Sequence, residues 1–222
     1  MSEERRNLFQ ALSSVIQRRK TTKVLADPAD PVSLNREKLE SVEAAVRESV
    51  RVAAMAPFHH DRKTDGLAEP WRVTILWNET CRCLATELPG LIVLPPNNRL
   101  PNLMSGCAAA VFVSWLPAEA MADSEKEQHV NVEHVAATGA YVQNLLLLLE
   151  AQGLESYWAS AGLLASPAVL NRLNFPDNQK VLAVVYVGVP GSGKPGTQRL
   201  GGKNRVNRGD AGRLTREINK LD

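Results

Sequence analysis

The strongest pattern in the chain is a run of helical hydrophobic periodicity over residues 125–152. Apolar and small residues recur in it at spacings of three and four, which predicts an amphipathic helix. They are Val132, Val135, Ala136, Gly139, Val142, Leu145, Leu146 and Leu149. Past Ala136 further apolar residues fill most of the other face, so we expect the C-terminal half to be buried nearly all round. Gly153 is typical of a left-handed C-cap.

The same periodicity predicts two more long helices, over residues 3–19 and 35–55. Shorter helices are expected over residues 79–87, 167–173 and 214–221. The segment that follows Gly153 is rich in small and aromatic residues, and it suggests a site at the end of the longest helix.

Three runs predict strands, over residues 72–77, 107–115 and 181–187. The last two are continuously apolar, which is typical of buried strands. Because helices outnumber strands and long segments separate them, we expect an α/β or α+β layered fold, with residues 1–222 as one domain. A sheet this small leaves helical surface uncovered, and a homodimer would cover it.

Composition narrows the class of protein. The 222 residues are 44% hydrophobic and 23% charged, which is ordinary for a globular chain, and a net charge of +2 gives no nucleic-acid footprint. Three cysteines favour a reducing compartment over a disulfide framework. The first residues resemble no secretory signal, and the most apolar window, residues 107–116, is too short for a membrane span. We therefore expect a cytoplasmic protein that binds neither nucleic acid nor membrane.

Residues 188–194 match the first seven positions of the phosphate-binding loop pattern, but the eighth position does not match. There Pro195 replaces the Ser or Thr that would bind Mg²⁺, and proline has no backbone N–H for a phosphate. The sequence therefore disfavours a nucleotide-binding loop of this kind.

The histidines and cysteines do not form a metal-binding pattern. His129 and His134 are five residues apart, so they lie roughly 140° apart around a helix and do not easily share one metal. His59 and His60 have no spaced partner, and the Cys-x-Cys pair at residues 81–83 offers too few ligands. Solvated or packed side chains are favoured, and no metal site is predicted.

The basic residues at the end of the first helix are more informative. Arg18, Arg19, Lys20 and Lys23 place four cations within six residues. Such a group can be a solvated cap that complements the helix dipole. It can also bind an anion, because Arg offers a bidentate fork to phosphate and Lys a point charge.

Six motifs, in order between residues 8 and 199, together resemble the FMN-dependent nitroreductase family. They are IQRRKTTK (residues 16–23), AMAP (54–57), EPWR (69–72), AYVQNLLL (140–147), GLESYW (153–158) and VYVGVP (185–190). The resemblance implies a three-layer fold with a small, mostly antiparallel sheet flanked by helices. It also implies a homodimer with the long helix at its interface, and a C-terminal arm of about residues 191–222 that wraps the partner.

The resemblance further implies which residues hold FMN. Arg18, Arg19 and Lys20 would bind the phosphate and ribityl chain, with Lys23 as an addition. Three further groups are implied: Trp158, Ala159 and Ser160 along the isoalloxazine; Lys194 and Arg199 completing a phosphate clamp; and Pro57, Phe58 and His59 reaching the flavin from the other subunit.

The implied activity is an oxidoreductase that transfers hydride from NAD(P)H through flavin N5 to a nitroaromatic, quinone or similar small-molecule acceptor, by a ping-pong mechanism. The flavin carries the chemistry, so no catalytic side chain is expected. The chain departs from the family pattern at Lys20, at Glu69 and in a longer loop over residues 61–67. Two alternatives stay open: a helical interaction protein with a basic tail, and an FMN-binding member without reductase activity.

Overall fold

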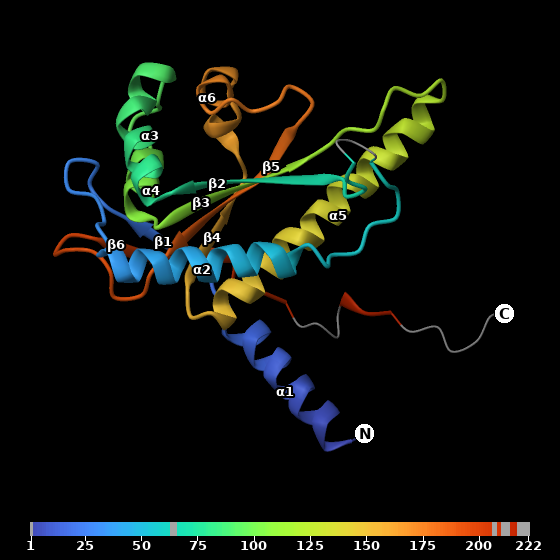
Figure 1. Cartoon of the computed structure of the whole chain (residues 1–222), viewed down its shortest axis with the longest axis horizontal. Coiled ribbons are helices and arrows are strands. Elements are labelled where there is room, and N and C mark those ends of the chain that lie inside the picture. Colours follow the sequence, from blue (N-terminus) through green and yellow to red (C-terminus); the bar gives the residue numbers. More distant parts are fainter. Residues whose placement is uncertain (1, 63–65, 206–207, 210–213, 217–222) are drawn as a thin grey trace.

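The computed structural model describes residues 2–62, 66–205, 208–209 and 214–216. Its centre is a four-stranded antiparallel sheet in the order β2–β3–β5–β4 (Figure 1). These strands are β2 (Trp71–Trp77), β3 (Ala109–Trp115), β4 (Glu155–Ala159) and β5 (Lys180–Gly188). A second, two-stranded antiparallel sheet pairs β1 (Thr22–Leu25) with β6 (Gln198–Gly201).

Six α-helices occur in the described part of the chain. They are α1 (Glu3–Arg18), α2 (Arg36–Ala53), α3 (Asn78–Leu91), α4 (Leu100–Gly106), α5 (Ser124–Ala151) and α6 (Pro167–Arg172). Short 3₁₀ turns cover Gly162–Ala165 and Lys203–Arg205. Side-chain caps begin the long helices: Asn35 accepts the Lys38 N–H at 2.9 Å, and Asp123 begins α5 in the same way.

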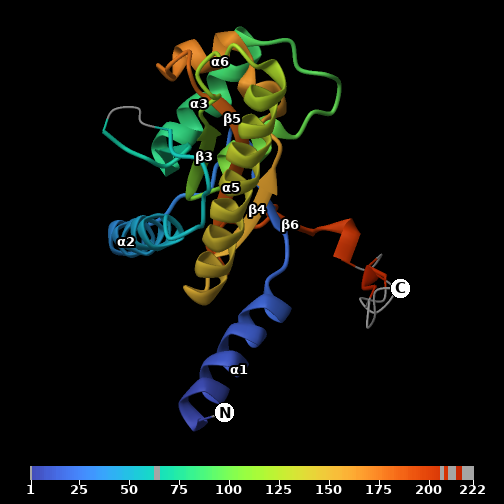
Figure 2. The same ribbon diagram turned by 90° about the vertical axis from the view of Figure 1, so that its right-hand side faces the viewer.

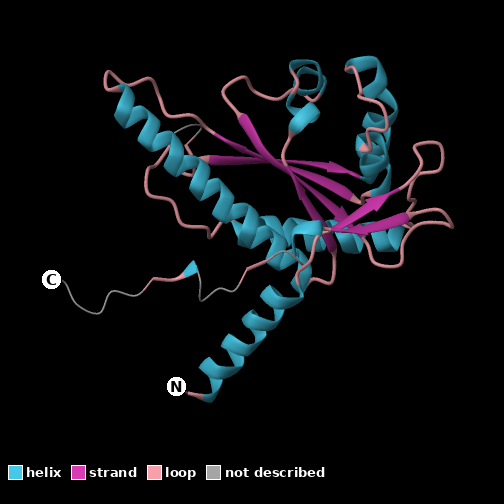
Figure 3. Ribbon diagram, turned by 180° about the vertical axis from the view of Figure 1, so that it is seen from behind, coloured by secondary structure: helices cyan, strands magenta, loops and turns pink. Residues whose placement is uncertain are grey.

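Helices cover both faces of the main sheet, which gives three layers (Figures 1 and 3). Side chains alternate between the faces of a strand. Val111, Val113 and Val185 pack in one core cluster with residues of α2 and α5. Phe112 and Val184 pack in a second cluster with residues of α3, α4 and α6. This arrangement confirms the predicted mixed α/β fold built on a small antiparallel sheet.

The predicted burial of α5 is only partly correct. Its C-terminal half is more buried than its first turns, and Leu145 and Leu149 are fully inaccessible. One strip of the helix is less covered: Ala136 is exposed, and a Cβ at Gly139 would meet no atom within 4 Å. Burial all round the helix therefore does not occur within a single chain.

Four elements were not predicted, namely β1, β4, β6 and α4. The basic segment that was expected only to end the first helix continues directly into β1. The turn expected after Gly153 is strand β4, and the tail after β5 returns to pair with β1. Gly106 shows how tightly β1 is held, because a Cβ there would lie 2.3 Å from the Val24 carbonyl oxygen.

Helix α1 extends away from the rest of the chain (Figure 2). None of its residues is buried. Four large apolar side chains on it are exposed, namely Leu8, Phe9, Leu12 and Ile16. Helix α1 contacts α5, but its large apolar side chains stay mostly uncovered within this chain.

The C-terminal arm is described as far as Arg205, apart from two short pieces beyond it. The helix predicted over residues 214–221 lies mostly outside the described residues. Among the helices that the structure describes, none combines the length and apolarity needed to cross a bilayer.

Candidate functional site

Strand β4 is an edge strand of the main sheet, and the sequence-predicted residues Trp158, Ala159 and Ser160 lie on it or directly after it. Its inner edge pairs with β5. On its outer edge, Ser156 forms a parallel bridge to Thr21, the residue before β1. Beyond that bridge the outer edge has no strand partner among the residues described. Backbone N–H groups on this edge are therefore open to a ligand.

The two faces of β4 carry different side chains. Trp158 lies opposite Val185, and 39% of its surface is exposed. Tyr157 points to the other face, where its ring stacks on Tyr186 with centroids 5.8 Å apart. Lys23 Nζ lies 4.6 Å from the centroid of the Tyr157 ring. A cation–π contact therefore fixes the N-terminal basic segment against β4.

Neither Tyr186 nor the thiol of Cys107 behaves as a reactive group. Burial raises the pKa of Tyr186 well above its usual value. A hydrogen bond with Cys81, together with burial, raises the pKa of the Cys107 thiol. Both shifts disfavour the ionised form, so neither group is an activated nucleophile.

Arg18, Arg19 and Lys20 join α1 to β1. Arg18 is the last residue of α1, and Arg19 caps the helix by donating its backbone N–H to the Val15 carbonyl at 2.9 Å. Arg18 and Lys20 are exposed, and Arg19 is half-buried. Because the next residue, Thr21, is bridged to β4, these three cations lie close to the open strand edge.

Arg199 lies at the centre of the contacts between the tail and β4. Its Nε donates to the two carboxylate oxygens of Glu155, at 2.9 and 3.1 Å. The same side chain donates to the carbonyl oxygens of Val189 and Ser192, both at 2.9 Å. Arg199 also lies opposite Val24 in the β1–β6 pair. A bound phosphate would therefore have to share this guanidinium with Glu155.

Lys194 forms an ion pair with Asp30, in the loop between β1 and α2. The turn that presents Lys194 depends on Gly193, whose φ of +101° disfavours other residues. A Cβ there would also lie 2.4 Å from the Thr197 side chain. Both cations predicted from the tail are thus engaged by carboxylates.

Pro57, Phe58 and His59 lie elsewhere in the molecule, just after α2. They line an open hollow of about 520 Å³, whose remaining lining residues, Glu133, Ala136, Ala137 and Ala140, belong to α5. This part of α5 is about 22 Å from the end of the helix at about 1.5 Å per residue, and β4 begins beyond that end. No residue of β4 lines this hollow.

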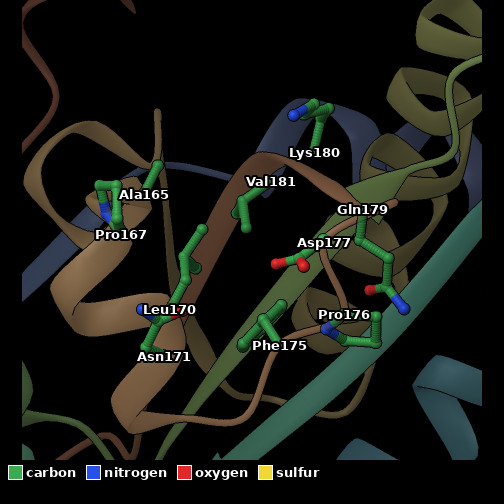
Figure 4. Close-up of a pocket in the computed structure, with 10 residues that line it drawn as sticks. All are labelled: Ala165, Pro167, Leu170, Asn171, Phe175, Pro176, Asp177, Gln179, Lys180 and Val181. Carbon is green, nitrogen blue, oxygen red and sulfur yellow. The ribbon is translucent and has the colours of Figure 1, made fainter.

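A second hollow, of about 340 Å³, lies between α6 and the start of β5. Its lining includes Leu170, Phe175, Asp177 and Lys180 (Figure 4). None of the residues predicted to bind a cofactor lies in it, so the site at β4 and the hollow beside α5 remain the candidates.

Three residues at β4 were missed from the sequence, namely Thr21, Glu155 and Tyr157. The available signal was the pair of aromatic residues Tyr157 and Trp158, a residue type enriched in strands. A strand there would have placed Tyr157 and Trp158 on opposite faces. Nothing in the local sequence indicates that Thr21 bridges to β4, because the contact is long-range.

Comparisons with known proteins agree with this fold. The model of the nitroreductase family matches residues 28–189. No curated protein matches the chain.

Among solved structures, a nitroreductase-like family protein from Bacillus cereus is similar at 18% identity and a TM-score of 0.64, over 94% of this chain and 96% of that one. A presumed nitroreductase in complex with FMN from Desulfovibrio desulfuricans has 20% identity and a TM-score of 0.57, over 95% and 98%. A variant of the FMN and NADPH-dependent nitroreductase NfnB from a Sphigopyxis strain has 16% identity and a TM-score of 0.52, over 80% and 87%.

Proposed function

Because the chain belongs to the nitroreductase family, we propose that it is an FMN-dependent oxidoreductase that acts as a homodimer. The observation that carries this proposal is the meeting of three distant segments at the open edge of β4. They are the basic segment with Lys23, the exposed Trp158, and the tail with Arg199. Two of the solved structures with this fold belong to proteins whose names include FMN.

The residues at β4 fit the chemical parts of FMN. An exposed indole and unpaired backbone N–H groups on an edge strand suit a planar ring with polar edges. Exposed Arg18 and Lys20, close to that edge, suit the phosphate. When bound, FMN accepts hydride from NAD(P)H and passes electrons to a nitroaromatic, quinone or similar acceptor.

The protein's task in this proposal is to bind and orient. Arg18, Arg19 and Lys20 hold the phosphate and ribityl chain. The backbone and side chains of Trp158, Ala159 and Ser160 hold one side of the ring. Since the pKa shifts of the buried groups beneath β4 disfavour their ionised forms, no side chain is assigned an acid–base or nucleophilic step.

The homodimer explains where the other side of the ring comes from. Pro57, Phe58 and His59 line a hollow that contains no residue of β4, and in this proposal the partner subunit supplies them to the flavin. Two surfaces suit such a partner: the exposed apolar face of α1, and the strip of α5 at Ala136 and Gly139 where backbones can approach closely.

Colour is the first test of the proposal. Purified protein is expected to be yellow, or to become yellow on reconstitution with FMN, and NAD(P)H should bleach it. Protein that binds no FMN would contradict the cofactor assignment. Flavin-loaded protein that does not oxidise NADH or NADPH would instead contradict the reductase activity and leave FMN binding intact.

Arg199 and Glu155 give a sharper test of the phosphate site. Arg199→Ala should weaken FMN binding roughly 10- to 100-fold, because a hydrogen bond to a charged group contributes about 1.5–3 kcal/mol. Glu155→Gln should strengthen it, because the competing carboxylate charge is removed. Binding is measured by quenching of flavin fluorescence.

Riboflavin, which lacks the phosphate, is the matched control, and its affinity should not change in either variant. Arg18→Ala should behave like Arg199→Ala. Equal effects on FMN and riboflavin would show that Arg199 only supports the fold around β4, and circular dichroism of each variant checks its folding independently.

A further inference from the structure

Three histidines and a glutamate from two separate parts of the chain meet beside the hollow on α5. His59 and His60 follow α2, whereas His129 and Glu133 lie on α5. The ligand atoms of His59, His60 and Glu133 all lie within 4.8 Å of one another. His129 Nε2 lies 3.0 Å from Glu133 Oε1. Glu133 is therefore the centre of the group.

The helix creates half of this cluster. His129 and Glu133 are four residues apart, so their side chains lie on the same face of α5. The pair of histidines five apart, His129 and His134, does not take part, because His134 is buried and its Nδ1 lies 2.8 Å from the Leu116 carbonyl oxygen. The helical spacing that brings two ligand groups together is therefore the four residues from His129 to Glu133, and not the five residues from His129 to His134.

Distances within the cluster are compatible with a metal site, and the 3.0 Å between His129 Nε2 and Glu133 Oε1 is equally the length of an N–H···O hydrogen bond. Four atoms bound tetrahedrally to zinc at about 2.0–2.1 Å are about 3.3 Å from each other. The separations of 3.0 Å (His129 to Glu133) and 3.5 Å (His60 Nε2 to Glu133 Oε2) lie on either side of this value. The histidine rings also lie together, with centroids 4.8 Å apart for His59–His60 and 6.3 Å apart for His60–His129.

Glu133 provides a second, independent observation. Its Oε2 is buried and has no hydrogen-bond partner among the described residues, although His60 Nε2 lies 3.5 Å away. A buried carboxylate oxygen without a donor is costly. A divalent cation between Glu133 and the imidazoles would compensate it.

We propose that His59, His60, His129 and Glu133 bind a divalent transition metal, with Zn²⁺ as the representative ion. Three imidazole nitrogens and one carboxylate oxygen form a ligand set that Zn²⁺ accepts in tetrahedral geometry. The ligand atoms of His59, His60 and Glu133 are already within 4.8 Å of one another. His129 lies outside that group, and its 68% exposed side chain has to rotate to reach the same ion.

The bound metal would tie the loop after α2 to the middle of α5. Arg62 anchors the same loop a few residues later, by donating to the Pro117 carbonyl oxygen at 2.8 Å. The metal therefore fixes Pro57 and Phe58, which form one wall of the hollow. The role assigned to it is structural, and it does not depend on flavin binding at β4.

Zinc titration of tag-free, chelator-treated and desalted protein tests the proposal. Calorimetry should show one Zn²⁺ per chain, and Mg²⁺, which prefers oxygen ligands, should not bind at this site. Glu133→Gln and His60→Asn should each weaken Zn²⁺ binding on the order of 100-fold or more, since even residues that only orient metal ligands contribute 10- to 100-fold. Bound Co²⁺ should give the visible absorption of a tetrahedral ion.

Glu125→Gln is the matched control, because it removes the same charge from an exposed position in the first turn of α5. His129→Asn guards against misfolding, since its side chain is 68% exposed and its replacement leaves the core unchanged. It should also weaken Zn²⁺ binding. Absence of stoichiometric binding, or equal affinities in the wild type and all three ligand variants, would overturn the proposal.

Discussion

Replacing Leu12 by glutamate should dissociate the proposed dimer. Leu8, Phe9, Leu12 and Ile16 are 70%, 66%, 52% and 50% exposed on α1. Fully burying such a side chain contributes about 1.5–3 kcal/mol, so covering these exposed fractions would contribute roughly 4–7 kcal/mol from each α1. Glutamate is a good helix former, so the change removes the apolar contact without breaking the helix.

The part of the interface free energy that comes from Leu12 sets the expected change in the dimer dissociation constant. About half of its side chain is exposed, which corresponds to roughly 1 kcal/mol per helix and roughly 2 kcal/mol per symmetric dimer. The dimer dissociation constant should therefore rise at least about 30-fold, and further because a carboxylate would be buried at the interface. Sedimentation velocity over a dilution series measures this constant directly.

Val93→Glu is the control, since Val93 is 92% exposed in the loop after α3 and lies on neither proposed surface. FMN retention should fall in the Leu12 variant in parallel with dissociation, because in the proposed dimer the partner supplies Pro57 and Phe58. A wild-type protein that is monomeric at every concentration, or a Leu12 variant that dissociates no more than the Val93 variant, would refute this account of α1.

Two further substitutions test the packing behind the site. Tyr141→Phe should cost about 1 kcal/mol of the free energy of unfolding, because it removes the hydrogen bond from Tyr141 to the Val50 carbonyl at 3.2 Å. Burial raises the pKa of Tyr141, so the contribution of the protonated phenol to the free energy of unfolding is complete below the unfolded pKa of about 10 and is lost at higher pH. Urea titrations should therefore show that the Phe variant loses less stability at alkaline pH than the wild type. Gly106→Ala should cost about 1–3 kcal/mol, because the new Cβ would meet backbone of Val24 at 2.3 Å, and thermal melts should show no such loss for Gly90→Ala, which has open space.

The sequence predicted those elements whose signal is local. The long helix α5 and the buried strands β3 and β5 follow from periodicity and continuous apolar runs. Strands β1 and β6 have only four residues each, and their pairing joins opposite ends of the chain. Helix α4 was not predicted, and its Pro101 lies in the first turn, where proline is well tolerated.

In the candidate site, too, the sequence predicted the features with a local signal and missed the long-range contacts. The basic segment and Trp158 were recognised from sequence motifs, and they do lie near one strand edge. The ion pair between Arg199 and Glu155 was not foreseen, because residues 44 apart meet only through the β1–β6 pairing. The His–Glu cluster was not foreseen for a related reason: the residues that meet His129 and Glu133 come from a loop about 70 residues earlier in the chain.

The pairing of β1 with β6 has a consequence for the order in which the protein is made. Leu25 near the start of the chain lies opposite Gln198 near its end, so this sheet closes a loop that contains most of the protein. Closing so long a loop is entropically unfavourable until the intervening domain has folded. During synthesis, β1 must wait for its partner until β6 has been made, ten residues after β5 completes the central sheet. The two-stranded sheet that carries Lys23 and Arg199 is therefore expected to close last, on a central sheet that has already folded.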